Sequence, residues 1–76
     1  MIKLINIQAN GVNSIRVDAL IEGKIENSFE IVFDMKGEIL SSTATKKQNY
    51  YKAQARIAFR KYVGQPLPKE ICSMWY

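Results

Sequence analysis

Residues 46–64 read KKQNYYKAQARIAFRKYVG, and this stretch decides the fold class that the sequence predicts. Just before it, Thr45 stands three residues ahead of Gln48, which is the spacing of a capping box, where each side chain bonds the other residue's backbone N–H. At the far end, Gly64 supplies the left-handed residue that commonly closes a helix, and prolines follow. We therefore predict one long helix from about Lys46 to Val63.

One side of the predicted helix is apolar. At the helical rotation of about 100° per residue, a set of large and small apolar side chains gathers within about a third of the circumference. The alanines in this set allow a close approach to a neighbouring element, and the tyrosines can keep their hydroxyls near water. We interpret this stripe as the packing face of the helix, in preference to a surface that stacks on a ligand. Its members are Tyr51, Ala55, Ala58, Phe59 and Tyr62.

The chain before the helix alternates between apolar and polar residues, which is typical of strands with one buried face. The alternation is clear in residues 15–21 and stronger in residues 25–33. After the second run, Asp34 and Gly37 have the pattern of a type I turn, and residues 38–41 can return as a short further strand. The side chains expected on the buried face of the two runs are Ile15, Val17, Ala19, Ile21, Ile25, Asn27, Phe29, Ile31 and Phe33.

A first strand is predicted at residues 2–9, with its register left open. The dipeptide Asn10-Gly11 is favoured in a tight two-residue hairpin turn. Such a turn leaves Ile5 and Ile7 on the face opposite to the other apolar residues of the strand. Either the sheet is covered on both sides, or a bulge shifts the register.

Together these patterns predict a single α+β domain over residues 1–76. We expect an antiparallel β-meander of three to four strands packed against one long C-terminal helix, because a chain of this length buries only one small core. A short apolar tail follows, and it either folds back over the open side of the sheet or presents an aromatic patch to a partner. Cys72 is predicted to be a buried and unreactive thiol, because its neighbours in the tail are apolar.

The composition argues against an enzyme. The chain has no histidine, which removes the commonest general base in proteins. Its single cysteine cannot build a zinc site or an intramolecular disulfide, and its four glycines do not form a glycine-rich phosphate loop. We therefore expect no catalytic residue, no cofactor and no metal.

Sequence features also bear on location and assembly. No apolar run approaches the roughly 20 residues that cross a bilayer, and Asn6 and Gln8 interrupt the apolar start that a signal peptide needs. We expect a cytoplasmic protein that makes no membrane contact and exists as a monomer or a homodimer. Abundant isoleucine, lysine and asparagine suggest an AT-rich bacterial or phage genome.

Positive charge is concentrated in the second half of the chain. Residues 1–38 hold four basic and six acidic residues, whereas residues 39–76 hold seven basic residues and one acidic residue. Lys52, Arg56 and Arg60 follow one another at intervals of four and form a ridge that no neighbouring acid in the helix neutralises. Lysine and arginine in such a row can contact successive phosphates of a nucleic acid.

The ridge has competing interpretations. It can be a solvated surface, it can pair with carboxylates from the sheet, or it can attract an acidic protein. Pairing within the protein is the strongest rival, because the acidic residues lie where the helix must dock. The candidate carboxylates are Glu22, Glu26, Glu30 and Glu38.

We predict a small non-enzymatic binding module that contacts the backbone of DNA or RNA through the basic face of the helix. The alternative is a protein-interaction module, such as a small inhibitor or an accessory subunit. It would use the acidic sheet face or the tail, through Met74 and the aromatic residues Trp75 and Tyr76. Binding to phosphates weakens steeply with salt, whereas a contact through the tail does not. The predicted nucleic-acid-binding residues are Lys46, Lys47, Lys52, Arg56, Arg60 and Lys61.

Overall fold

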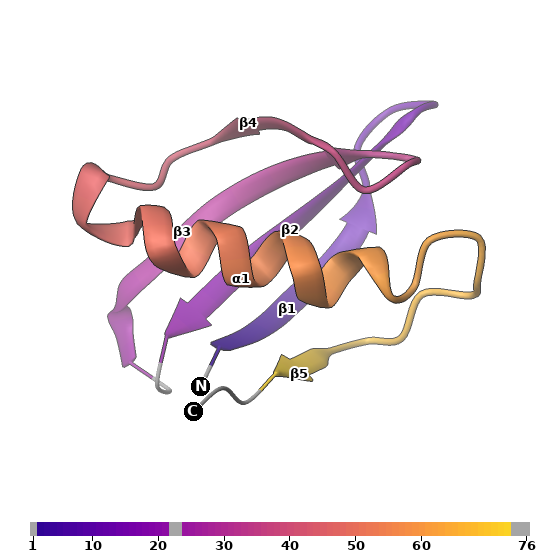
Figure 1. The fold of residues 1–76 in the computed structure, drawn as a ribbon. Helices are drawn as coiled ribbons and strands as arrows, with labels where there is room; N and C mark the ends of the chain where they lie inside the picture. The colour runs from indigo at the N-terminus through magenta and orange to yellow at the C-terminus, as the bar shows by residue number, and fades with distance from the viewer. Residues whose placement is uncertain (1, 22–23, 74–76) are drawn as a thin grey trace.

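The computed structural model describes residues 2–21 and 24–73 of the 76-residue chain. Within these ranges, five strands form one antiparallel sheet in the order β4-β3-β2-β1-β5, and helix α1 crosses one face of it (Figure 1). The 3₁₀ turn η1 leads directly into α1. The elements are β1 (Ile2–Ala9), β2 (Ser14–Ile21), β3 (Lys24–Asp34), β4 (Ile39–Ser42), η1 (Lys46–Gln48), α1 (Asn49–Arg60) and β5 (Ile71–Ser73).

The predicted α+β architecture is confirmed, with an addition at one edge of the sheet. Strands β1 to β4 follow one another as the predicted meander, and each is paired with its neighbour in sequence. In the described part of the chain, β5 adds a fifth strand, antiparallel to β1, so that Leu4 lies opposite Ile71. The chain therefore crosses from β4 to the opposite edge of the sheet through α1 (Figure 1).

A bulge in β1 sets the register of the first hairpin. The pairing with β2 shifts between Ile5 and Gln8, and Asn6 adopts a positive φ of 52° inside the bulge. Because this inserts an extra residue, Ile7 returns to the core side and packs against the buried cluster. The two-residue turn predicted at Asn10-Gly11 is wrong, since residues 10–13 connect the two strands.

The core lies between α1 and the face of the sheet that it covers. The alternation predicted for β2 is confirmed, because all four of its apolar alternate residues are buried. The rings of Phe33 on β3 and Phe59 on α1 stack in parallel with their centroids 4.1 Å apart, which ties the helix to the centre of the sheet. The buried apolar residues are Ile2, Leu4, Ile15, Val17, Ala19, Ile21, Phe29, Ile31, Phe33, Ala55, Ala58, Phe59 and Ile71.

The helix prediction holds for its position and its packing face. Ala55, Ala58 and Phe59 are buried, and the tyrosines of the stripe are half-buried against the core. The Gln48 side chain accepts a hydrogen bond from the Thr45 backbone N–H at 2.9 Å, as a capping box requires. The regular helix is shorter than predicted at both ends, because its first residues form a 3₁₀ turn and its last turn tightens before Gly64.

The start of the tail is an edge strand. Ile71 on β5 is buried in the core, whereas Cys72 is exposed. The prediction of a buried thiol is therefore wrong, and the cause is the alternation of a strand, which turns Cys72 away from the core that Ile71 enters. The aromatic patch predicted at residues 74–76 lies outside the described residues.

Candidate nucleic-acid interface

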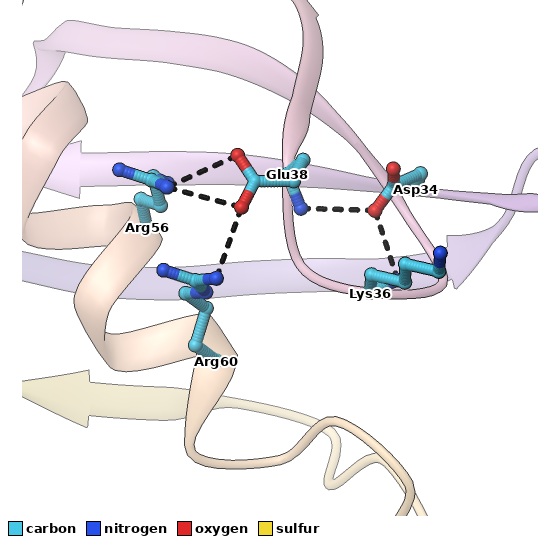
Figure 2. A network of polar contacts seen from close by, with 5 residues as sticks. All are labelled: Asp34, Lys36, Glu38, Arg56 and Arg60. Carbon is cyan, nitrogen blue, oxygen red and sulfur yellow. Dashed lines mark hydrogen bonds and ion pairs between the residues drawn. The ribbon is translucent and has the colours of Figure 1, made fainter.

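The turn between β3 and β4 places one carboxylate beside the helix. Asp34 Oδ1 accepts hydrogen bonds from the backbone N–H groups of Lys36 at 2.8 Å and Glu38 at 2.9 Å (Figure 2). The bond from Glu38, more than that from Lys36, holds the pKa of Asp34 below its usual range. The Gly37 N–H donates to the Asp34 carbonyl at 3.1 Å, which closes the predicted turn. These bonds fix the backbone of Glu38.

Gly37 allows this turn to lie directly against the end of α1. Its backbone has a φ of +86°, in the left-handed region that favours glycine. A Cβ atom at this position would lie 2.7 Å from Cγ of Arg60 and 3.0 Å from Cγ2 of Val63. The sequence pattern predicts the turn at Gly37, but this close approach to the helix is a tertiary feature.

Glu38 is held by two arginines of the predicted ridge. Nη2 of Arg56 lies 3.0 Å from each oxygen of the Glu38 carboxylate, and Nη2 of Arg60 lies 2.9 Å from Oε1 (Figure 2). All three side chains are close to half exposed, so water screens these contacts. The interpretation that the ridge pairs with a carboxylate of the sheet is therefore confirmed for Arg56 and Arg60.

This pairing supplies the neutralising carboxylate that the helix itself lacks. The two arginines share one carboxylate, so one positive charge remains after pairing. Sequence reasoning found no acid three or four positions away in the helix, because Glu38 is 18 residues before Arg56 and reaches it only through the fold. The guanidinium of Arg56 also keeps a buried Nε that has no hydrogen-bond partner.

The four lysines of the predicted site have a different environment. Within residues 2–21 and 24–73, Lys46, Lys47, Lys52 and Lys61 form no ion pair. Lys46 and Lys47 are exposed in η1, Lys61 is exposed directly after α1, and Lys52 is half-buried on the same flank as Arg56. The fold thus brings all six predicted residues to one helical segment, which keeps a strong positive charge.

The hydroxyl-rich segment before the helix, residues 41–45, offers fewer free hydroxyl groups for binding an anion than its sequence suggests. Thr43 Oγ1 accepts a hydrogen bond from the Glu30 backbone N–H at 2.8 Å. Ser42 Oγ accepts one from the Ala44 N–H at 3.3 Å. Thr43 thus fastens the connection between β4 and η1 to β3, and Ser42 stabilises the connection locally. The basic side chains remain the main groups that can contact an anion.

On the acidic face of the sheet, Arg16 lies close to the carboxylates of Glu30 and Asp18. Arg16 Nη2 lies 2.6 Å from Oε2 of Glu30 and 3.7 Å from Oδ1 of Asp18, and Asn6 donates to Asp18 at 2.9 Å. The hydrogen bond from Arg16 lowers the pKa of Glu30 and raises the pKa of Arg16 itself. The side chains of Glu22 and Glu26 lie outside the described residues. Among the described residues, one arginine lies between two carboxylates here, which leaves a surplus of one negative charge.

An apolar hollow of about 280 Å³ lies at the end of the molecule where α1 finishes. Phe59 and Ile15 form part of its lining. The lining also includes three residues with exposed side chains, namely Met35, Val63 and Leu67. Sequence reasoning missed this hollow, because its lining comes from the β2 start, the β3–β4 turn and the segment after α1. No local pattern joins those three segments.

The part of the chain that the structure describes shows neither a metal-ligand cluster nor a candidate membrane-spanning helix. It contains no group of three or more histidine, cysteine, aspartate or glutamate side chains placed to hold a metal ion. None of its helices has the length and apolarity needed to cross a bilayer. No protein-family model matches the sequence, and no curated protein or solved structure is significantly similar to it.

Proposed function

We propose that this protein is a small non-enzymatic binding module of the cytoplasm that contacts the backbone of a nucleic acid through residues 46–61. The observation that carries the proposal is the charge balance of this segment. Arg56 and Arg60 share the single carboxylate of Glu38. The other four cations of the segment form no ion pair among the described residues, namely Lys46, Lys47, Lys52 and Lys61.

The shape of the segment supports the same proposal. At a rise of about 1.5 Å per residue, Lys46 and Lys61 are separated by about 20 Å along the helix. That length matches roughly six base-pair steps of a duplex at about 3.4 Å each. The stacked rings of Phe33 and Phe59 anchor α1 to the sheet, so Lys52, Arg56 and Arg60 project from an element that is packed on the core. Lysines that neutralise phosphates release counterions, which is the main source of sequence-independent affinity.

The test is a gel-shift titration with single-stranded DNA, duplex DNA and RNA of about 20 nucleotides, each at two or more salt concentrations. We expect binding at low salt that weakens with a log–log slope of about −0.7 to −0.9 per phosphate contact. Replacing Lys46, Lys47 and Lys61 together by glutamine should reduce the size of that slope by about two to three contacts.

The matched control removes the same charge elsewhere. Glutamine at Lys3, Lys36 and Lys69 takes three positive charges from the rest of the molecule and leaves residues 46–61 intact. We expect this control to keep most of the slope of the parent protein. The proposal fails if the parent protein shifts none of the three nucleic acids at low salt, or if the two triple variants lose affinity equally.

The second candidate function is protein binding. The apolar hollow beside Met35, Val63 and Leu67 favours it, because exposed apolar side chains around a concave site are typical of contact surfaces. The sequence offers two further surfaces for the same function, namely the acidic sheet face and the apolar tail residues Met74, Trp75 and Tyr76. Binding through an apolar contact should barely respond to salt, which separates it from phosphate contact in the same titration.

A further inference from the structure

The cluster around Glu38 has the layout of an anion site that is already filled. Arg56 and Arg60 are one helical turn apart, and both direct Nη2 at the same carboxylate (Figure 2). The backbone bonds of Asp34 hold Glu38 in front of them. Two guanidiniums that converge on one point are a common way to bind a phosphate group, because each can donate two bonds to its oxygens.

The contacts between Glu38 and the two arginines do not use every N–H donor of the guanidiniums. Both contacts of Arg56 to the carboxylate come from Nη2, and Nε of Arg56 is buried without a hydrogen-bond partner. A planar carboxylate offers two oxygens, whereas a tetrahedral phosphate offers more acceptors in several directions. A phosphate at this point can therefore accept hydrogen bonds from the two guanidiniums in more directions than the Glu38 carboxylate does.

We propose that Arg56 and Arg60 form a phosphate-binding subsite and that Glu38 is a built-in competitor for it. The proposal deepens the proposed function and, for a phosphate in a nucleic-acid backbone, rests on it. The same chemistry also recognises free inorganic phosphate. In either case the Glu38 side chain swings away, while its backbone stays fixed by Asp34, and the guanidiniums exchange one anion for another.

Exposure makes this exchange physically reasonable. The Glu38 side chain is 47% exposed, so its carboxylate can leave the arginines for water without opening the core. A surface ion pair holds its partners weakly, because water screens both charges. The affinity of the subsite for phosphate then depends on how much more strongly the two arginines bind phosphate than they bind Glu38. Removal of the Glu38 charge should therefore raise the affinity for phosphate.

The experiment titrates inorganic phosphate at constant ionic strength against ¹⁵N-labelled protein, with the arginine Nε–H signals as the readout. Glu38→Gln removes the competing charge and keeps the size of the side chain. We expect saturable shifts at Arg56 and Arg60, with a Kd at least tenfold lower than in the parent protein. An equal titration with chloride should not reproduce them.

The matched control is Glu30→Gln, which takes a carboxylate from Arg16 on the sheet. That variant also takes a carboxylate from an arginine, but it leaves Arg16 beside Asp18 and creates no pair of converging guanidiniums. Its response to phosphate should therefore equal that of the parent protein. Equal responses of the two variants, or a gain at Glu38→Gln that chloride reproduces, would overturn the proposal. If Glu38→Gln fails to fold by circular dichroism, Glu38→Asp tests the same point, since its shorter carboxylate should give a smaller gain.

An oligonucleotide arm separates the two sources of phosphate. Tighter binding of both inorganic phosphate and single-stranded DNA by Glu38→Gln assigns the subsite to a nucleic-acid backbone. A gain for inorganic phosphate in a protein that binds no oligonucleotide supports the subsite and refutes the proposed function. Oligonucleotide binding that is equal in parent and variant, with no gain for inorganic phosphate, refutes the subsite and leaves the proposed function standing.

Discussion

Two arginine–carboxylate clusters on this small domain have opposite charge balances. On the open face of the sheet, one arginine, Arg16, lies between the carboxylates of Glu30 and Asp18. Beside the helix, two arginines share the single carboxylate of Glu38. The first cluster has a surplus of negative charge and the second a surplus of positive charge. The comparison indicates the helix side as the place where an anionic partner would bind.

The clusters also differ in how the fold builds them. The sheet cluster comes from cross-strand neighbours, because Asp18 lies opposite Glu30 in the β2–β3 register and Arg16 is two residues away. The helix cluster exists only because the β3–β4 turn packs against the end of α1. A change that moves this turn should therefore break the helix cluster and leave the sheet cluster intact.

Gly37→Ala is the change with the largest expected effect. A left-handed conformation costs a residue with a Cβ atom about 1–2 kcal/mol, and overpacking commonly adds about 1–3 kcal/mol. Here the new Cβ would approach Cγ of Arg60 to 2.7 Å, so either the Arg60 side chain or the turn must shift. We expect the free energy of unfolding, measured by urea denaturation followed by circular dichroism, to fall by about 2–4 kcal/mol.

Gly11→Ala is the control for the backbone term. Gly11 has a φ of +84°, almost the same as Gly37, but a Cβ there meets no atom within 4 Å. Only the conformational cost remains, so this variant should lose about 1–2 kcal/mol. Equal losses in the two variants would show that the contact between turn and helix contributes nothing, and the comparison between the clusters would lose its structural basis.

The meander and the helix could be predicted because their signals are local. The alternation in residues 15–21, the turn at Asp34 and the capping box at Thr45 each act over a few neighbouring residues. The bulge at Asn6 and the strand β5 could not be fixed in the same way. A bulge depends on what the opposite strand offers, and a three-residue strand is too short to display a period.

The site was only partly predictable for the same reason. Spacing along the chain identified the six cations, because residues three or four apart share a helix face. The sequence named Glu38 only as one of four candidate carboxylates, and spacing could not choose among them, since Glu38 is 18 residues from Arg56 in sequence and 3.0 Å away in space. Charge compensation in this domain is a tertiary property, and the exposed position of Cys72 likewise depends on pairing with β1.

Removal of each carboxylate tests whether the two clusters differ in stability. Glu38→Gln leaves two positive charges one helical turn apart, whereas Glu30→Gln leaves Arg16 with Asp18 at 3.7 Å. After the discount for solvent screening, we expect Glu38→Gln to lower the free energy of unfolding by up to about 1 kcal/mol and Glu30→Gln to lower it by less. Urea denaturation at low salt and at 1 M sodium chloride measures both.

High salt should reduce the difference between these two variants, because added ions screen exposed charges. A difference that persists unchanged in 1 M salt would mean that Glu38 acts through packing or hydrogen bonding and not through its charge. The parent protein measured at both salt concentrations supplies the reference for each variant.

The smallest expected effect concerns the charge on Asp34, which positions Glu38. The pKa of Asp34 is held below its usual range, foremost by the hydrogen bond from the Glu38 N–H. A carboxyl whose pKa is lower in the folded state than in the unfolded state stabilises the fold above its unfolded pKa of about 4, and this contribution disappears as the pH falls through the folded value.

Asp34→Asn keeps an oxygen acceptor at the same place and removes the charge, so the comparison with the parent protein isolates the ionic contribution. We expect the variant to unfold at a lower urea concentration than the parent protein at pH 7. The two midpoints should converge as the pH is lowered below about 4, because Asp34 of the parent protein then takes up a proton. A difference between the two midpoints that stays constant from pH 7 to pH 2 would assign the loss to hydrogen-bond geometry. The charge of Asp34 would then not stabilise the turn that positions Glu38.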